Sequence, residues 1–116
     1  MNKDVVILGS TGSIGCSTLK CLKKDKSFKI KILTTNKNVS KIFKQAVLYN
    51  VKDIIIEDKK KYFKNIKKFK LKKIKLHLGI NNINKILKKK VSYCVNSISG
   101  IDGLEPTLKM IPKTKN

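Results

Sequence analysis

A buried strand that runs directly into a glycine-rich loop and then into a helix is the feature that most constrains how this chain folds. Residues Val5–Leu8 form an unbroken apolar run of mostly β-branched side chains, typical of a strand buried on both faces of a parallel sheet. The loop Gly9–Gly15 follows at once, and from Ser13 or Ile14 to Leu22 the apolar residues have helical spacing. A strand, such a loop and a helix in this order are the setting of a dinucleotide-binding motif.

The three glycines of the loop suit three different tasks. Gly9 allows a sharp turn off the strand, Gly12 allows the backbone to approach a phosphate closely, and Gly15 allows the helix to pack against the sheet. The free N–H groups of the first helical turn and the helix dipole favour a dianionic pyrophosphate, and the hydroxyl groups of Thr11 and Ser13 add donors. We therefore expect this loop to hold a dinucleotide; the alternative is a glycine-rich turn without a ligand.

The end of the second predicted strand distinguishes NADH from NADPH. An Asp or Glu about 20 residues beyond the loop would accept the ribose hydroxyls of NAD. Residues Thr34–Asn38 occupy this position with no carboxylate, and they include Lys37. A lysine with small polar donors suits the 2′-phosphate of NADPH, so the sequence predicts NADPH. The alternative is that Lys37 is one more lysine in a chain that has 28 of them.

Strand-like and helix-like segments alternate along the whole chain. This alternation predicts an α/β fold, a Rossmann-like doubly wound, mainly parallel sheet with helices on both faces. The predicted strands are 5–8, 28–33, 53–56, 74–78 and 91–98, and the predicted helices are 13–22, 38–49, 58–68, 81–89 and 103–111.

Apolar spacing also predicts which side chains face the core. The predicted inward residues are Ile42, Phe43, Ala46 and Val47 in the second helix, and Tyr62, Phe63 and Ile66 in the third. Asn38 or Ser40 would cap the second helix, and Asp58 would start the third. The lysines that alternate with apolar residues in strand 28–33 are expected near an edge of the sheet or on a poorly covered face.

The net charge of +21 would ordinarily indicate a polyanionic partner. All the basic residues are lysine, and nucleic-acid readers rarely do without arginine. The lysines are scattered along the chain and accompanied by many Ile and Asn residues, as a strongly AT-rich coding sequence would supply by default. Nucleic acid is therefore the less favoured partner, although a polyanion-binding surface stays open as an alternative.

The three cysteines form no Cys-x-x-Cys pair and, with the lone His77, no metal-ligand spacing. An odd number of cysteines without a leader favours reduced thiols, so we expect a cytoplasmic protein. No apolar run approaches the length of a membrane span, so no membrane association is expected.

A second glycine-rich segment, Ser97–Leu108, also follows a predicted strand and opens a predicted helix. Open α/β sheets bind ligands at this edge, so the segment would line the nicotinamide end of the cleft. A strand-to-helix turn with Thr107 or Asp102 as a cap explains it equally well.

Together, Ile7–Leu19 and Ser99–Leu108 resemble the N-terminal domain of 1-deoxy-D-xylulose 5-phosphate reductoisomerase, and Lys37-Asn38-Val39 resembles the second cofactor segment of that family. The resemblance implies roles for two groups of residues. It implies that the pyrophosphate of NADPH is held by Thr11, Gly12, Ser13 and Ile14. It implies that the adenosine 2′-phosphate is held by Asn36, Lys37 and Asn38, where Asn36 replaces a frequent glycine.

The family makes 2-C-methyl-D-erythritol 4-phosphate in non-mevalonate isoprenoid biosynthesis, with a divalent cation, Mg or Mn, and a phosphosugar substrate. The resemblance implies that residues 1–116 are the NADPH-binding domain, truncated before the catalytic and C-terminal domains that hold the metal and build a homodimer. This chain alone is then expected to be inactive, with no catalytic residues and no metal ligands. The alternatives are a stand-alone nucleotide-binding module without catalysis and a basic nucleic-acid-binding protein.

Overall fold

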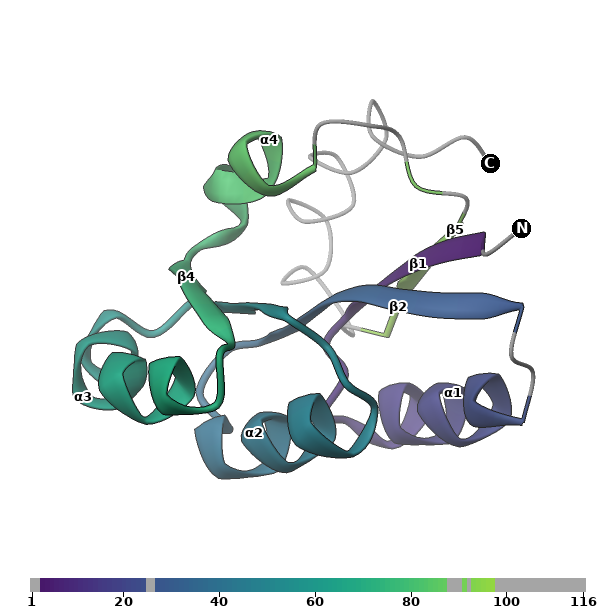
Figure 1. The fold of residues 1–116 in the computed structure, drawn as a ribbon, viewed down its shortest axis with the longest axis horizontal. Coiled ribbons are helices and arrows are strands. Elements are labelled where there is room, and N and C mark those ends of the chain that lie inside the picture. Colours follow the sequence, from purple (N-terminus) through teal and green to yellow (C-terminus); the bar gives the residue numbers. More distant parts are fainter. Residues whose placement is uncertain (1–2, 25–26, 88–90, 92, 98–116) are drawn as a thin grey trace.

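The structure, a computed structural model, describes residues 3–24, 27–87, 91 and 93–97. Its centre is a five-stranded sheet in which every neighbouring pair is parallel (Figure 1). The strands are β1 (Lys3–Leu8), β2 (Phe28–Thr35), β3 (Asp53–Ile56), β4 (Lys75–Leu78) and β5 (Tyr93–Asn96). The helices are α1 (Ser13–Lys23), α2 (Val39–Leu48), α3 (Lys59–Leu71), the short 3-10 helix η1 (Ile80–Asn82) and α4 (Ile83–Ile86).

The strand order is β4-β3-β2-β1-β5. The chain therefore moves outward from β1 to β4 and then returns to pair β5 on the other side of β1. This reversal creates a switch point between β1 and β5, and open α/β sheets bind ligands beyond the carboxyl ends of the strands at such a point. The loop Gly9–Gly15 leaves β1 at that end.

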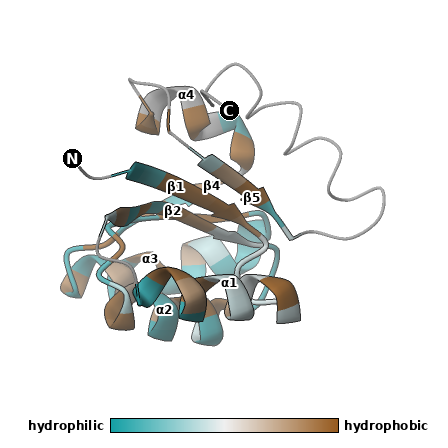
Figure 2. Cartoon of the chain, turned by 90° about the vertical axis from the view of Figure 1, so that its right-hand side faces the viewer, coloured by the Kyte–Doolittle hydropathy of each residue, from teal (hydrophilic) through white to brown (hydrophobic). Residues whose placement is uncertain are grey.

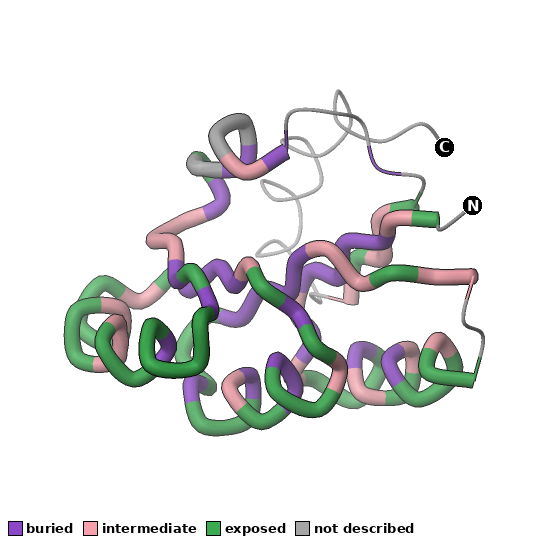
Figure 3. Tube along the Cα trace, in the orientation of Figure 1, coloured by how far each residue is buried: buried purple, intermediate pink, exposed green. Residues whose placement is uncertain are grey.

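Helices cover both faces of the sheet, as the alternating pattern predicts. Helices α1, α2 and α3 lie on one face, and η1 with α4 lies on the other (Figures 1 and 2). The first face buries a core that includes Ile7, Leu33 and Phe69, whereas the second buries one that includes Leu8, Ile55 and Ile83. Buried residues follow the strands through the middle of the molecule (Figure 3). The predicted Rossmann-like α/β class is confirmed.

The lysines of β2 lie in the part of that strand that extends beyond its pairing with β3. β3 pairs only with the half of β2 from Ile32 to Thr35, while β1 pairs from Phe28 to Leu33. The first half of β2 is thus locally an edge, although the strand as a whole is central. Lys29 is exposed there, and Lys31 is the extra residue at a register shift against β1.

Two helices are rotated relative to the predicted inward faces. In α2, Val47 is half exposed, and Gln45 is buried beside Ala46. In α3, Phe63 is 62% exposed, while Phe69 is fully buried. The prediction was wrong for Val47 and Phe63 because adjacent positions on a helix lie about 100° apart, so an apolar residue next to the buried stripe points outward. Phe69 meets Phe43 of α2 edge-to-face, with ring centroids 5.0 Å apart.

The remaining elements differ from prediction mainly in length. The predicted helix 81–89 is observed as η1 followed by the four residues of α4, and β5 is shorter than the predicted strand 91–98. β2 extends two residues further than predicted, to Thr35. The predicted helix 103–111 lies outside the described residues.

Candidate dinucleotide-binding site

Two glycines of the β1–α1 loop are required by the fold itself. Gly9 has a φ of +74°, a conformation that side chains rarely adopt. A Cβ atom at Gly15 would lie 2.6 Å from both the Gly9 carbonyl oxygen and the Ser10 Cα, closer than packed atoms approach. Gly15 therefore lets the first turn of α1 pack on the loop that precedes it, rather than directly on the sheet as predicted.

Gly12 differs from both because nothing in the fold requires it. Its φ of −78° and ψ of 174° suit any residue, and the nearest atom to an added Cβ would be the Gly9 oxygen at 3.7 Å. Gly12 is the N-cap of α1, and no side chain caps that helix. The first turn of α1, which begins with Ser13 and Ile14, therefore presents its backbone N–H groups without a side-chain acceptor.

Two threonines at the end of β2 hold the loop in place. The Gly9 N–H donates to Thr34 Oγ1 at 3.0 Å, and the Ser10 N–H donates to the Thr34 carbonyl at 3.0 Å. The hydroxyl oxygens of Thr11 and Thr35 lie 2.8 Å apart, and either can be the donor. The sequence places Thr34 and Thr35 only beside the predicted 2′-phosphate residues, but their hydroxyl groups bind the β1–α1 loop.

Helix α2 holds the same loop through a buried amide. The Ser10 hydroxyl donates to Gln45 Oε1 at 2.8 Å, and Gln45 Nε2 donates to the Ser10 carbonyl at 2.9 Å. Gln45 Nε2 also lies 3.6 Å from the Cys16 sulfur. The sequence signal was available: Gln45 is a polar residue inside the buried stripe of an amphipathic helix.

A serine that follows β5 binds the loop from the other side of the switch point. The Ser97 hydroxyl lies 2.6 Å from the Leu8 carbonyl oxygen and 2.7 Å from that of Gly9. The Ser97 N–H also donates to the Leu8 carbonyl at 2.9 Å. Ser97 is the one residue of the second glycine-rich segment that the structure describes, and the role predicted for the rest lies outside the described residues.

The predicted 2′-phosphate residues form an exposed turn at the end of β2. The Val39 N–H donates to the Lys37 carbonyl at 2.8 Å around Asn38, whose φ of −80° and ψ of 70° define an inverse γ-turn. The Asn38 side chain caps α2 by accepting from the Lys41 N–H at 3.4 Å. The Asn36 carbonyl accepts from the Asp58 N–H at 3.0 Å, which joins this turn to the start of α3.

A lysine-lined groove of about 290 Å³ opens beside this turn, between α2 and α3. We refer to it as the lysine groove. Its lining residues are Lys37, Asn38, Val39, Ser40, Lys61, Lys64, Asn65 and Lys68, and none of these carries a carboxylate. The two predicted groups of site residues therefore lie at the carboxyl ends of the neighbouring strands β1 and β2, and the second group borders a strongly cationic surface.

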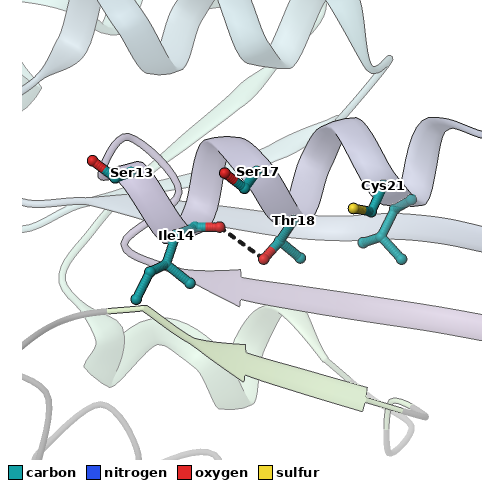
Figure 4. Close-up of a pocket in the computed structure, with 6 residues that line it drawn as sticks. Ser13, Ile14, Ser17, Thr18 and Cys21 are labelled. Carbon is teal, nitrogen blue, oxygen red and sulfur yellow. Dashed lines mark hydrogen bonds between the residues drawn. The ribbon is translucent and has the colours of Figure 1, made fainter.

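A shallow hollow of about 410 Å³ runs along α1 from the predicted pyrophosphate residues (Figure 4). Ser13 and Ile14 lie at its helix-start end, and Ser17, Thr18 and Cys21 continue it along the helix. The Thr18 hydroxyl donates to the Ile14 carbonyl at 2.8 Å. Ile14 is 65% exposed, which places a large apolar side chain in solvent directly beside the uncapped helix start.

The part of the chain that the structure describes holds no group of three or more His, Cys, Asp or Glu residues that could bind a metal ion. His77 instead pairs with Asp53 across neighbouring strands, with 3.0 Å between Nε2 and Oδ1.

Among the described residues, no helix is long and apolar enough to cross a membrane. Cys16, Cys21 and Cys94 are free thiols.

A parallel sheet with a switch point, a glycine-rich loop anchored there and an uncapped helix start define a Rossmann-like domain, the class of fold in which dinucleotide sites are found. Residues 5–116 match the family model for 1-deoxy-D-xylulose 5-phosphate reductoisomerase, and the chain belongs to that family. Membership favours a reductoisomerase domain over a stand-alone nucleotide-binding module or a nucleic-acid-binding protein.

Relatives named 1-deoxy-D-xylulose 5-phosphate reductoisomerase support this membership. The protein from Pelagibacter ubique is 46% identical over 116 residues, which cover 97% of this chain and 30% of that protein. The protein from Wolbachia pipientis is 35% identical over 110 residues, which cover 94% of this chain and 28% of that protein. The chain therefore spans about 30% of the length of these curated relatives.

Solved structures of the same enzyme share the fold. The Zymomonas mobilis enzyme in complex with NADPH superposes with a TM-score of 0.85 at 26% identity, covering 100% of this chain and 32% of that one. A reductoisomerase in complex with NADPH, fosmidomycin and magnesium gives a TM-score of 0.74 at 26% identity, covering 92% of this chain and 27% of that one.

Proposed function

We propose that this chain is the NADPH-binding portion of a 1-deoxy-D-xylulose 5-phosphate reductoisomerase. The observation that carries the proposal is Gly12, a glycine that neither its backbone angles nor its neighbours require. A missing side chain at this position leaves room for a ligand to reach the backbone of the helix start. The NADPH complex of the Zymomonas mobilis relative supports the choice of ligand.

The pyrophosphate would be held by Thr11, Gly12, Ser13 and Ile14. The N–H groups of the first turn of α1 donate to its oxygens, and the dipole of the helix favours its charge. Thr35 has a specific part in this arrangement. If its hydroxyl donates to Thr11 Oγ1, the Thr11 hydroxyl proton is free to point at a phosphate oxygen.

The 2′-phosphate would be held by Asn36, Lys37 and Asn38. All three are exposed at the end of β2, and Lys37 and Asn38 line the lysine groove. A phosphate with close to two negative charges suits a groove whose described lining contains four lysines and no carboxylate. The preference for NADPH over NADH therefore rests on Lys61, Lys64 and Lys68 as well as on Lys37.

When bound, NADPH supplies the hydride for the reduction in the reaction that yields 2-C-methyl-D-erythritol 4-phosphate. The described residues position this donor but offer no cluster that fits a divalent cation. We therefore propose that residues 1–116 are the NADPH-binding domain and that other parts of the enzyme hold the Mg or Mn ion and the phosphosugar. The proposal extends to a cytoplasmic homodimer in non-mevalonate isoprenoid biosynthesis, where free thiols suit a reducing compartment.

Titration of the protein with NADPH and NADH tests the proposal. We expect NADPH to bind more tightly, and we expect Lys37→Glu to weaken NADPH about tenfold, or about 1.4 kcal/mol, while NADH changes less than about twofold. Lys44→Glu is the matched control, because it makes the same charge change at an exposed position of α2 outside the lysine groove. Equal affinities for the two dinucleotides, or no binding of either, would overturn the assignment.

A further inference from the structure

Gln45 is a polar side chain in the middle of an apolar layer. It is only 8% exposed and lies on α2 between Ile42 and Ala46, which pack in the core on that face of the sheet. A buried amide without partners is costly, so its retention there needs a physical reason. The reason lies in what it binds, because its two polar atoms both reach the β1–α1 loop.

Every polar group of Ser10 is engaged by a neighbouring element. Its N–H donates to the Thr34 carbonyl of β2, its hydroxyl donates to Gln45 Oε1, and its carbonyl accepts from Gln45 Nε2. Ser10 is itself 0% exposed. The carbonyl that Gln45 holds belongs to the peptide group whose N–H is that of Thr11. Fixing this peptide fixes the entry to the Thr11–Ile14 segment, which is the proposed pyrophosphate site.

The same helix also starts at the other half of the proposed cofactor site. Asn38 is the N-cap of α2, and Lys37 precedes it. Gln45 therefore joins the loop at the end of β1 to the helix whose first turn follows the 2′-phosphate residues. A rigid helix then sets the spacing between the two anionic groups of the cofactor.

We propose that Gln45 is a positioning residue for cofactor binding: it touches no part of the cofactor, and it preorganises the pyrophosphate loop on α2. This inference rests on the proposed function. A preorganised loop binds with less loss of conformational freedom, so loosening it lowers affinity for the group that it holds. The effect must fall on the pyrophosphate rather than on the 2′-phosphate.

The test is Gln45→Met, which keeps length and removes both hydrogen-bonding atoms. We expect affinity for NADPH to fall about tenfold, because the loop loses its anchor. Affinity for adenosine 2′-monophosphate, which carries the 2′-phosphate and lacks the pyrophosphate, should change less than about twofold. Calorimetry for NADPH and NMR titration for the nucleotide measure the two affinities, and thermal unfolding of the same samples measures stability.

Ile42→Val is the matched control for a loss of stability in the same helix. Ile42 is 0% exposed on α2 and its side chain is wholly apolar, so its truncation destabilises the fold without releasing the loop. We expect it to leave affinity for both ligands within about twofold. Ser10→Ala provides a second variant if Gln45→Met does not fold, since it removes one of the two loop-to-Gln45 bonds and should weaken NADPH about threefold.

The outcomes separate this inference from the proposed function. If the wild-type protein binds no NADPH, the proposed function is wrong and the inference is wrong with it. If wild type binds NADPH but Gln45→Met binds it equally well, only the inference is wrong. It is also wrong if Gln45→Met weakens both ligands alike, or if Ile42→Val weakens NADPH as much, since either result indicates a purely structural role.

Discussion

The starts of α1 and α3 are similar in place and opposite in chemistry. Both helices follow a parallel strand at the same edge of the sheet, and neither has an acidic residue in its first turn. The N-cap of α3 is Asp58, whose carboxylate accepts from the Lys61 N–H at 2.9 Å. The N-cap of α1 is Gly12, which has no side chain that could accept a hydrogen bond, and the loop before the helix is bound by β2, α2 and Ser97.

The two helix starts differ in their first-turn N–H groups: a side chain of the chain caps α3, whereas no side chain caps α1. Asp58 supplies the anion that the dipole of α3 favours, and its carboxylate accepts from one N–H of the first turn. At α1 the chain instead supports the loop from three sides and leaves the donors open. The candidate site thus differs from an ordinary turn because hydrogen bonds hold the loop before the helix, while no side chain binds the first N–H groups of the helix itself.

The largest expected effect comes from breaking the packing under the α1 start. Gly15→Ala places a Cβ atom 2.6 Å from the Gly9 oxygen and the Ser10 Cα, both of which are backbone atoms. We expect it to lower the free energy of unfolding by about 3 kcal/mol, as overpacking does, and to abolish NADPH binding. Denaturant unfolding measures the first effect. Gly12→Ala is the control, since its Cβ has room and should cost less than about 1 kcal/mol.

A direct exchange of chemistry between the two helix starts comes next. Gly12→Asp gives α1 the cap that α3 has, and the backbone angles of Gly12 accept it. We expect the free energy of unfolding to rise by roughly a few tenths of a kcal/mol. We expect NADPH affinity to fall about 100-fold, or about 2.7 kcal/mol. Calorimetry and thermal unfolding on one sample show both. Gly12→Asn caps without charge and should lose less affinity, whereas unchanged NADPH binding in Gly12→Asp would remove the distinction between the two starts.

The reciprocal change at α3 should affect stability alone. Asp58→Ala removes the cap on the Lys61 N–H, and we expect it to lower the free energy of unfolding by about 1 kcal/mol. Affinity for NADPH should stay unchanged or rise slightly, because a negative charge is removed near the lysine groove. Asp58→Asn, which keeps the cap, is the control for charge. A large loss of affinity in Asp58→Ala with Asp58→Asn unaffected would show that α3 has a binding role.

The last expected effect is confined to alkaline pH and lies away from both helix starts, in β5. Burial raises the pKa of the Cys94 thiol from 9.0 to about 11. Below pH 9 the thiol is neutral in the folded and unfolded chain, so its full contribution to stability is present. Between pH 9 and 11 the unfolded chain ionises first, and this contribution declines. The difference in unfolding free energy between wild type and Cys94→Ala should change over that range and stay constant below it.

The order of strand, loop and helix could be predicted from sequence because it depends on local patterns. The sequence alone contains the apolar run before Gly9, the glycine spacing and the absence of a carboxylate near Lys37. The contacts that anchor the loop could not be predicted, even where the pattern singles out Gln45, because Thr34, Gln45 and Ser97 lie far apart in the sequence. Their contact with the loop depends on strand order, which local patterns do not specify.

The rotation of α2 and α3 about their axes could not be predicted from the apolar pattern either. Val47 and Gln45 both lie near the apolar stripe of α2, and hydrophobicity favours burying Val47. The fold buries Gln45 because the loop supplies partners for its amide, and hydropathy alone does not count such partners. In the same way, Phe69 is buried rather than Phe63 because Phe43 of α2 lies opposite it.

Ser97 adds a consequence for the order in which this molecule assembles. Its hydroxyl joins residues 88 and 89 positions earlier in the chain, at the end of β1. Contacts of such sequence separation form late, because the intervening chain must first be ordered. The layer of α1, α2 and α3 on the sheet can therefore form before the loop has all of its anchors. The proposed NADPH site is therefore complete only after β1 and β5, the first and last described strands, have paired.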